Sequence, residues 1–312
     1  MKEVINMNQL ANKPLTKDTI GFSQFISNNA VKNKVNEIIG GKKGQQFITS
    51  IVSAVQNNPQ LKECTNTSIF NAALIGAALD LNPSPQLGQF YMVPFKNKNI
   101  GTKEAQFQLG YKGYIQLAIR SGQYKKINVL SIKDGELIRY DALNEEIEVN
   151  LIQDELAREN AETIGYYAMF EYTNGFRKSI FWSKEKMLKH ADKYSQAFSI
   201  SGYEKLKSGQ VPKEDLWKYS SFWYKDFDGM AYKTMLRQLI SKWGIMSIEM
   251  QTAYESDMAV IRDDGTKDYV ETDTDNFMVI DEIPTQEVNN IETSNVETET
   301  IKGPKKLNIN EL

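Results

Sequence analysis

The first third of the chain places its apolar residues at helical spacing. Helices are predicted over residues 22–40, 45–61 and 68–81. Gly40 ends the first of these helices, because glycine is the usual residue just past a helix C-terminus. Thr67 is a suitable N-cap for the third, and Pro83 stops it. This part of the chain is therefore expected to contain packed helices.

Beyond Pro85 the pattern changes to alternation, which is typical of strands that are buried on one face. Strands are predicted within residues 88–99, 103–111, 126–141, 144–152 and 165–183. The last segment is rich in aromatic residues and reads as a hairpin around Asn174-Gly175, and Asp134-Gly135 is a second turn signal. Short consecutive strands joined by turns indicate an antiparallel sheet.

A helix interrupts these strands in the stretch FQLGYKGYIQLAIRSGQYKK, residues 107–126. Its apolar positions recur at helical spacing from Tyr111 to Ile119, whereas Lys112, Gln116 and Arg120 share another face. Gly110 and Gly113 bracket the first turn, where a bare backbone could approach a ligand closely.

The pattern is helical again from Ser183, a fair N-cap for residues 184–194. The last ordered block is predicted over residues 215–244, which are rich in tryptophan and cations. Helices that flank a meander of strands indicate an α+β fold with a small antiparallel sheet.

Charge divides the chain into two parts. The formal net charge is −3, but residues 249–312 hold sixteen acidic and five basic residues, so residues 1–248 carry a net +8. We expect a flexible segment over residues 1–20, a folded core over 21–250 and an acidic, largely disordered tail over 251–312. A basic body with an acidic tail recurs in proteins that handle nucleic acid.

The sequence argues against a disulfide framework, against several kinds of binding site and against a membrane span. Cys64 and His190 are the chain's only cysteine and histidine, which excludes a disulfide framework and leaves no His/Cys cluster for zinc. The glycine-rich stretch GGKKG at residues 40–44 lacks the Lys-Ser/Thr of a phosphate-binding loop. The acidic residues around Asp226 and Glu146 have no distant acid with which to form a metal site. No apolar run approaches the ~18 residues of a membrane span, and we expect a cytoplasmic protein.

Aromatic and basic residues are interleaved near residues 91–98, 111–126 and 217–237. Cations can follow a phosphate backbone while aromatic faces stack on bases, which is how proteins bind single-stranded nucleic acid. The alternative is that these aromatic residues belong to the core and these cations to solvated helix faces. Lys225, Lys233 and Arg237 are spaced to share one helical face, which favours a binding role.

Four stretches of sequence resemble a known family. The stretches GQFYMVPFKNKN (88–99), QLGYKG (108–113), AIRSG (118–122) and MAYKTMLR (230–237) occur in the order found in the RecT family of phage and prophage single-strand annealing proteins. The family often has adjacent basic residues where this chain has Ile119-Arg120 and Tyr232-Lys233.

The resemblance implies an ATP-independent recombinase that forms a ring or filament on single-stranded DNA and promotes annealing to a complementary strand. It implies no cofactor, with Mg²⁺ at most a counterion of the DNA. It also implies a partner exonuclease and contact with a host single-strand-binding protein, which we assign to the tail. The predicted DNA contacts are Lys96, Lys98, Tyr111, Lys112, Arg120, Lys125, Lys126, Lys225, Lys233 and Arg237.

Two other classes of function remain open at this point. The chain could be a scaffold that assembles through its N-terminal helices and carries an incidental basic face. It could also be a nuclease whose catalytic carboxylates are not recognisable as a pair in the sequence.

Overall fold

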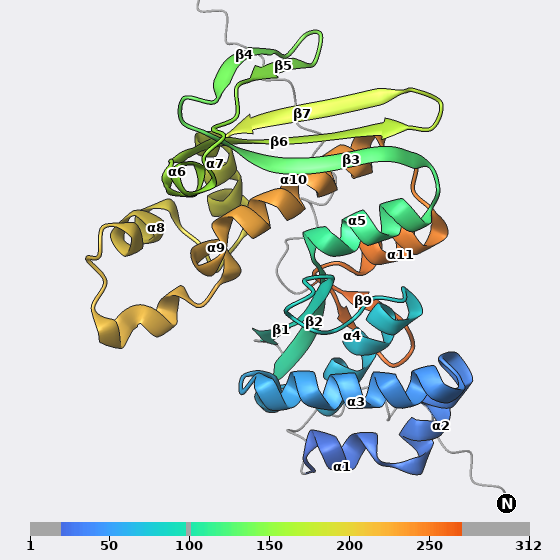
Figure 1. The fold of residues 1–312 in the computed structure, drawn as a ribbon. Coiled ribbons are helices and arrows are strands. Elements are labelled where there is room, and N and C mark those ends of the chain that lie inside the picture. Colours follow the sequence, from blue (N-terminus) through green and yellow to red (C-terminus); the bar gives the residue numbers. More distant parts are fainter. Residues whose placement is uncertain (1–19, 98–100, 270–312) are drawn as a thin grey trace, which may run out of the picture. The chain divides into compact units, whose positions relative to one another are not determined.

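The N-terminal part of the protein is a block of helices. The computed structural model describes residues 20–97 and 101–269. The block comprises α1 (Phe22–Ile26), α2 (Asn29–Ile38), α3 (Gly41–Asn57), the 3₁₀ turn η2 (Leu61–Glu63) and α4 (Asn66–Ala78), shown in blue to blue-green in Figure 1. These helices bury an apolar cluster that includes Phe47, Ile51 and Phe70. Burial of such large side chains stabilises the block by roughly 1.5–3 kcal/mol for each residue.

Two details of this block differ from the prediction. The single helix expected over residues 22–40 is two helices, because Asn28 is extended and its side chain accepts a hydrogen bond from the N–H of Ala30 to cap α2. The N-cap of α4 is Thr65 instead of Thr67. The glycine-rich stretch at residues 40–44 leads into α3 and forms its first turn.

A hairpin and a helix follow the block. Strands β1 (Phe90–Lys96) and β2 (Lys103–Leu109) pair antiparallel, with Phe90 opposite Leu109. Helix α5 (Tyr111–Arg120) begins directly after β2. The hairpin packs on α4 so closely that a Cβ added to Gly76 would lie 2.2 Å from the Phe90 ring. The strands and the helix predicted here from sequence are confirmed.

The largest sheet has three antiparallel strands in the order β3-β6-β7. Its strands are β3 (Tyr124–Lys133), β6 (Thr163–Tyr172) and β7 (Arg177–Ser183), and a second hairpin pairs β4 (Leu137–Asp141) with β5 (Glu146–Val149). Helix α10 lies along one face of the three-stranded sheet, and the β4–β5 hairpin lies on the other side (Figure 1). The hairpin predicted around Asn174-Gly175 is confirmed, and Gly175 has the positive φ of 88° that the turn requires.

The remaining elements are mostly helical. They are α6 (Glu155–Asn160), α7 (Lys184–Tyr194), α8 (Ile200–Lys207), the 3₁₀ turn η3 (Lys213–Tyr219), α9 (Phe222–Lys225), α10 (Phe227–Trp243), α11 (Ile248–Ser256) and the short strands β8 (Val260–Ile261) and β9 (Lys267–Asp268). The Ser183 side chain caps α7 by accepting from the N–H of Lys186, as predicted. The α+β class with small antiparallel sheets is confirmed. Among the described residues, no helix combines the length and apolar character needed to cross a bilayer.

The folded core extends beyond its predicted end at residue 250. Most of helix α11 and both β8 and β9 fall in the predicted tail, yet Ala253, Asp257 and Ala259 are buried. Ala259 accepts a hydrogen bond from the N–H of Phe107 in β2, at 3.0 Å, which joins this segment to the hairpin. The part of the predicted tail beyond Tyr269 lies outside the described residues, as does the predicted N-terminal segment up to residue 19.

Candidate nucleic-acid interface

The N-terminus of α5 is held against the loop that precedes β1. The N–H of Gly110 donates to the carbonyl of Gln89 at 2.9 Å. A Cβ added to Gly110 would lie 2.1 Å from the carbonyl oxygen of Gly88, and one added to Gly113 would lie 2.1 Å from that of Gln89. Only glycine fits at these two positions. The sequence suggests that these glycines leave room for a ligand, but the protein's own backbone occupies that room.

Lys112 lies in the first turn of α5 and is exposed. Its side chain runs past Gly88, where a Cβ would lie 3.4 Å from Lys112 Cδ and 3.1 Å from the Tyr91 hydroxyl. The Lys112 ammonium group lies 5.9 Å from the centre of the Tyr111 ring. No carboxylate within the described ranges forms an ion pair with Lys112. Its charge is therefore available to an external anion.

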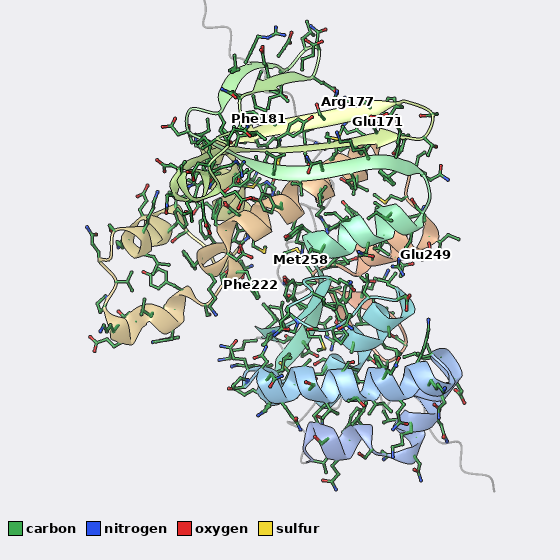
Figure 2. All side chains as sticks on the ribbon, in the orientation of Figure 1. Glu171, Arg177, Phe181, Phe222, Glu249 and Met258 are labelled. Atoms are coloured by element: carbon green, nitrogen blue, oxygen red, sulfur yellow. The ribbon has the colours of Figure 1, made fainter. Side chains whose placement is uncertain are left out.

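Two pairs of aromatic side chains lie next to Lys112, one through Tyr91 and one through Tyr111. The rings of Tyr91 and Phe222 are 5.4 Å apart, and those of Tyr111 and Tyr232 are 5.5 Å apart. Phe222, labelled in Figure 2, begins α9 and remains 41% exposed, whereas the three tyrosines are half-buried. We call Tyr91, Tyr111, Lys112, Phe222 and Tyr232 together the tyrosine–lysine surface.

The tyrosine–lysine surface keeps the Tyr91 hydroxyl protonated. Burial, followed by the negative charge of Asp226 and the neighbouring Tyr111, raises the pKa of Tyr91 above its ordinary value. Tyr91 therefore remains a neutral hydrogen-bond donor at physiological pH. A cation, a neutral hydroxyl donor and partly exposed rings in one place are what a phosphate with its attached base requires.

The structure distributes the other predicted contacts over several places. Lys96, Lys126 and Lys225 are exposed and form no ion pair with any described carboxylate. Of these three, Lys225 shares the short helix α9 with Phe222. Lys98 lies outside the described residues. The tyrosine–lysine surface thus brings together Tyr111 and Lys112 from the predicted set, and α9 links Lys225 to it.

Arg120 ends α5, Lys125 lies beyond that end, and both have partners of their own. Arg120 donates to the carbonyl of Leu79 at 2.5 Å and lies 3.6 Å from the Asp80 carboxylate, so it binds the C-terminus of α4. Lys125 pairs with Glu171 on the neighbouring strand at 2.5 Å. The eight-residue spacing from Lys112 to Arg120 corresponds to about 12 Å along a helix, so Arg120 and Lys125 do not share one site with Lys112.

Lys233 and Arg237 are inside the protein, which corrects the prediction that they share an exposed helical face with Lys225. Lys233 is 6% exposed, and its Nζ lies 2.8 Å from Oδ1 of Asp257, which is fully buried. Arg237 pairs with the other oxygen of the same carboxylate. Lys225 belongs to a separate helix, because the non-helical backbone of Asp226 separates α9 from α10. We therefore assign Lys233 and Arg237 to the fold.

Three members of the surface, Tyr91, Phe222 and Tyr232, are not among the predicted contacts, although Tyr91 lies in the aromatic and basic stretch at residues 91–98. For Phe222 and Tyr232 the signal in the sequence is the density of aromatic residues between positions 215 and 244. That signal does not separate Phe222 from the buried Trp223 and Phe227, because all three sit in one short stretch.

Comparison with known proteins identifies the chain's relatives. A model of the RecT family matches residues 45–273. The chain belongs to the RecT family. It is also 36% identical over 295 residues to the uncharacterised protein YqaK of Bacillus subtilis strain 168, covering 94% of this chain and 90% of YqaK. It is 27% identical over 216 residues to the protein RecT of Escherichia coli strain K12, covering 68% of this chain and 71% of RecT.

Membership of the RecT family places the chain among DNA recombination proteins of the single-strand annealing class, and it implies DNA binding and self-association. The matched range includes every member of the tyrosine–lysine surface. It also includes α11, β8 and β9, in agreement with their place in the folded core. Within residues 20–97 and 101–269, no three His, Cys, Asp or Glu side chains are grouped so that they could hold a metal ion.

Proposed function

We propose that this RecT family protein binds single-stranded DNA at the tyrosine–lysine surface and promotes annealing to a complementary strand, as an oligomer and without ATP. The observation that carries the proposal is Lys112, an exposed ammonium group without a described acidic partner, next to the rings of Tyr91, Tyr111 and Phe222. The chain's family supports the annealing class of activity.

The chemistry of this proposal requires no bond to be made or broken. Lys112, and Lys225 on the adjoining α9, neutralise phosphates and release counterions from the strand. The partly exposed rings hold bases by stacking, which accepts any sequence because every base has a π face. A second strand gains base pairing and stacking when it matches, so pairing itself drives the reaction.

Binding of a labelled oligonucleotide at several salt concentrations tests the proposal. Each phosphate contact of a single strand contributes about −0.7 to the slope of log affinity against log salt. We expect wild-type protein to bind with a negative slope and Lys112→Ala to bind more weakly. Lys32→Ala is the matched control, because Lys32 is an exposed lysine on α2, far along the chain from the surface. Wild-type protein without affinity at low salt would refute the proposal and favour the scaffold alternative.

We also propose that the acidic C-terminal region contacts a partner exonuclease and a host single-strand-binding protein. Its support is composition, since residues 270–312 hold ten acidic and three basic residues. A chain ending at Tyr269 should keep its DNA affinity and lose retention of these partners on immobilised protein. Equal retention by the full-length and shortened chains would refute this assignment.

A further inference from the structure

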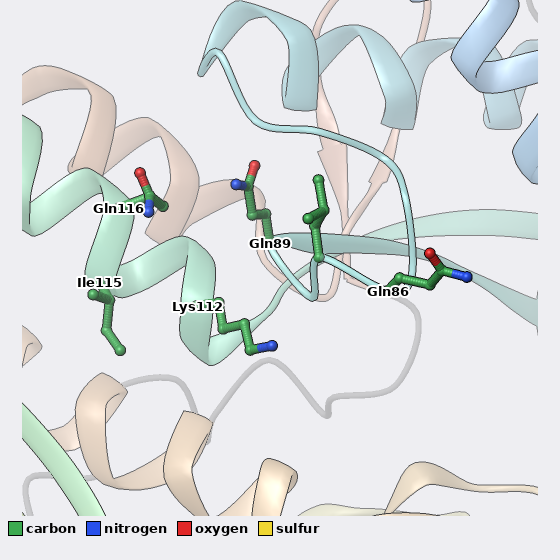
Figure 3. A pocket seen from close by; sticks show the side chains of 6 residues that line it. Gln86, Gln89, Lys112, Ile115 and Gln116 are labelled. Carbon is green, nitrogen blue, oxygen red and sulfur yellow. The ribbon is translucent and has the colours of Figure 1, made fainter.

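A small pocket lies between the loop that precedes β1 and helix α5. Its volume is about 290 Å³, at the small end of the ~300–1,000 Å³ typical of ligand pockets. Figure 3 shows side chains that line it from both elements. The lining residues are Gln86, Leu87, Gln89, Lys112, Ile115 and Gln116. DNA binding at the tyrosine–lysine surface uses Lys112 and leaves the three glutamines without a role.

Two of these glutamines have unused hydrogen-bonding groups. The Gln89 carboxamide is fixed, because its Oε1 accepts from the N–H of Asn82 at 2.7 Å. The carboxamides of Gln86 and Gln116 form no hydrogen bond with the part of the chain that the structure describes. Each offers one acceptor and two donor hydrogens, and the flat amide group matches the hydrogen-bonding edge of a nucleobase.

The rest of the lining suits the other parts of a nucleotide. Leu87, which is 46% exposed, and the half-buried Ile115 provide apolar contacts for the faces of a flat ring. Lys112 belongs to both the pocket and the tyrosine–lysine surface, so its ammonium group can meet a phosphate of the same strand. One cation, apolar walls and free carboxamides are the groups that a single nucleotide would use.

We propose that this pocket holds one nucleobase of the bound single strand, unstacked from its neighbours, with Gln116 at its edge and Lys112 at its phosphate. This inference rests on the proposed function and goes beyond it by assigning a base-binding site. Unstacking costs a few kcal/mol, least for a base that is already single-stranded. The pocket would therefore take a base most readily before the complementary strand arrives.

An oligonucleotide that carries one 2-aminopurine tests the pocket, because the emission of this base rises when it leaves the stack. The experiment uses full-length wild-type protein, Gln116→Leu and the control Gln123→Leu, an exposed glutamine outside the pocket. Anisotropy of a terminal dye reports binding separately from 2-aminopurine emission. The loss of a hydrogen bond should weaken DNA binding by Gln116→Leu about two- to tenfold. Emission is therefore compared at protein concentrations at which all the DNA is bound.

We expect emission to rise on binding to the wild type and to Gln123→Leu, and to rise less on binding to Gln116→Leu. If DNA binds and the wild type leaves emission unchanged, or all three proteins raise it equally, the pocket assignment is overturned while DNA binding stands. If the wild type fails to bind DNA, the proposed function and the pocket assignment both fall. Equal unfolding temperatures of the three proteins exclude a folding defect as the cause of a difference.

Discussion

Lys233 Nζ and Asp257 Oδ1 lie 2.8 Å apart in the interior of the protein. The same carboxylate accepts the N–H of Leu109 at 2.9 Å and pairs with Arg237. Asp257 therefore joins α10, β2 and the segment after α11 at one point. Leu109 lies two residues before Tyr111, at the start of α5. The buried Asp257 carboxylate therefore fixes the backbone next to the proposed DNA-binding surface.

Replacing Asp257 should strongly destabilise the fold. Asp257→Ala leaves two cations buried without their carboxylate, a change that costs about 3–5 kcal/mol in comparable buried pairs. Asp215→Ala is the control, because the Asp215–Lys218 pair is exposed and such pairs contribute about 1 kcal/mol or less. Urea unfolding measures both free energies. Similar losses for the two variants would contradict the role given to Asp257.

Removing Lys112 should change DNA binding without changing stability. In a plot of log affinity against log salt concentration, Lys112→Ala should make the slope less negative by about 0.7. This change corresponds to one phosphate contact on a single strand. Lys32→Ala makes the same change of charge on α2 and should keep the wild-type slope. Titrations of a fluorescent oligonucleotide at several salt concentrations measure the slopes. An unchanged slope for Lys112→Ala would show that Lys112 does not contact phosphate.

Phe222 should contribute through stacking and not through charge. Phe222→Ala is expected to weaken binding by about 1–3 kcal/mol, the range for one base stacked on an aromatic ring, and to leave the salt slope unchanged. Phe176→Ala is the matched control, because Phe176 is 48% exposed in the turn between β6 and β7. If both variants bind as the wild type does, Phe222 is not a stacking platform.

The position at which the folded core ends toward the C-terminus can be tested by shortening the chain. A chain ending at Met250 loses Asp257 and the hydrogen bonds by which Met258 and Ala259 join Phe107, at 2.8 and 3.0 Å. We expect it to lack cooperative unfolding, whereas a chain ending at Tyr269 should unfold cooperatively. Near-ultraviolet circular dichroism during urea unfolding distinguishes the two. Cooperative unfolding of the shorter chain would place the boundary where the sequence first suggested.

Glu136 should make the fold sensitive to acid. Burial alone would raise the pKa of Glu136, but hydrogen bonds from Arg158 and from the N–H groups of Lys133 and Ile152 outweigh it and lower the pKa below its ordinary value. A carboxylate with a lowered pKa in the folded state stabilises the protein above the ordinary glutamate pKa, about 4.3. That stabilisation is lost as the pH falls through the lowered, folded-state value.

Glu136→Gln removes this titration and should flatten the acid side of the curve of unfolding temperature against pH. Glu159→Gln, at an exposed position on α6, is the control and should retain the wild-type curve. Thermal unfolding followed by circular dichroism across the acid range measures the curves. A Glu136→Gln curve as steep as that of the wild type would show that other groups cause the acid sensitivity.

Local signals made much of the fold predictable. Alternating residues in β1 and β2, the Asn174-Gly175 turn and the Ser183 cap each act within a few residues of the chain, so short windows of sequence contain them. The segment after residue 250 was misassigned because its acidic composition is typical of a tail. Asp257 belongs to the core only because Lys233 and Arg237, distant in the sequence, neutralise it there.

The candidate site was predictable only in part, for the same reason. Lys112 and Tyr111 lie in a motif that the sequence displays, and the structure places them together at the proposed surface. Spacing alone assigned Lys233 and Arg237 to an exposed face, because it does not reveal a buried carboxylate supplied by a later segment. The contact between Tyr91 and Phe222 joins β1 to α9, and no local pattern records such a contact.

Annealing of two complementary labelled oligonucleotides, without ATP, is the decisive test of whether the tyrosine–lysine surface promotes strand annealing. Wild-type protein, Lys32→Ala and the double variant Lys112→Ala/Phe222→Ala are compared at equal unfolding temperature, beside polylysine of similar charge. We expect the wild type and Lys32→Ala to accelerate annealing beyond polylysine, and we expect the double variant not to do so. A folded double variant that anneals as fast as the wild type, or a wild type no faster than polylysine, would contradict this expectation.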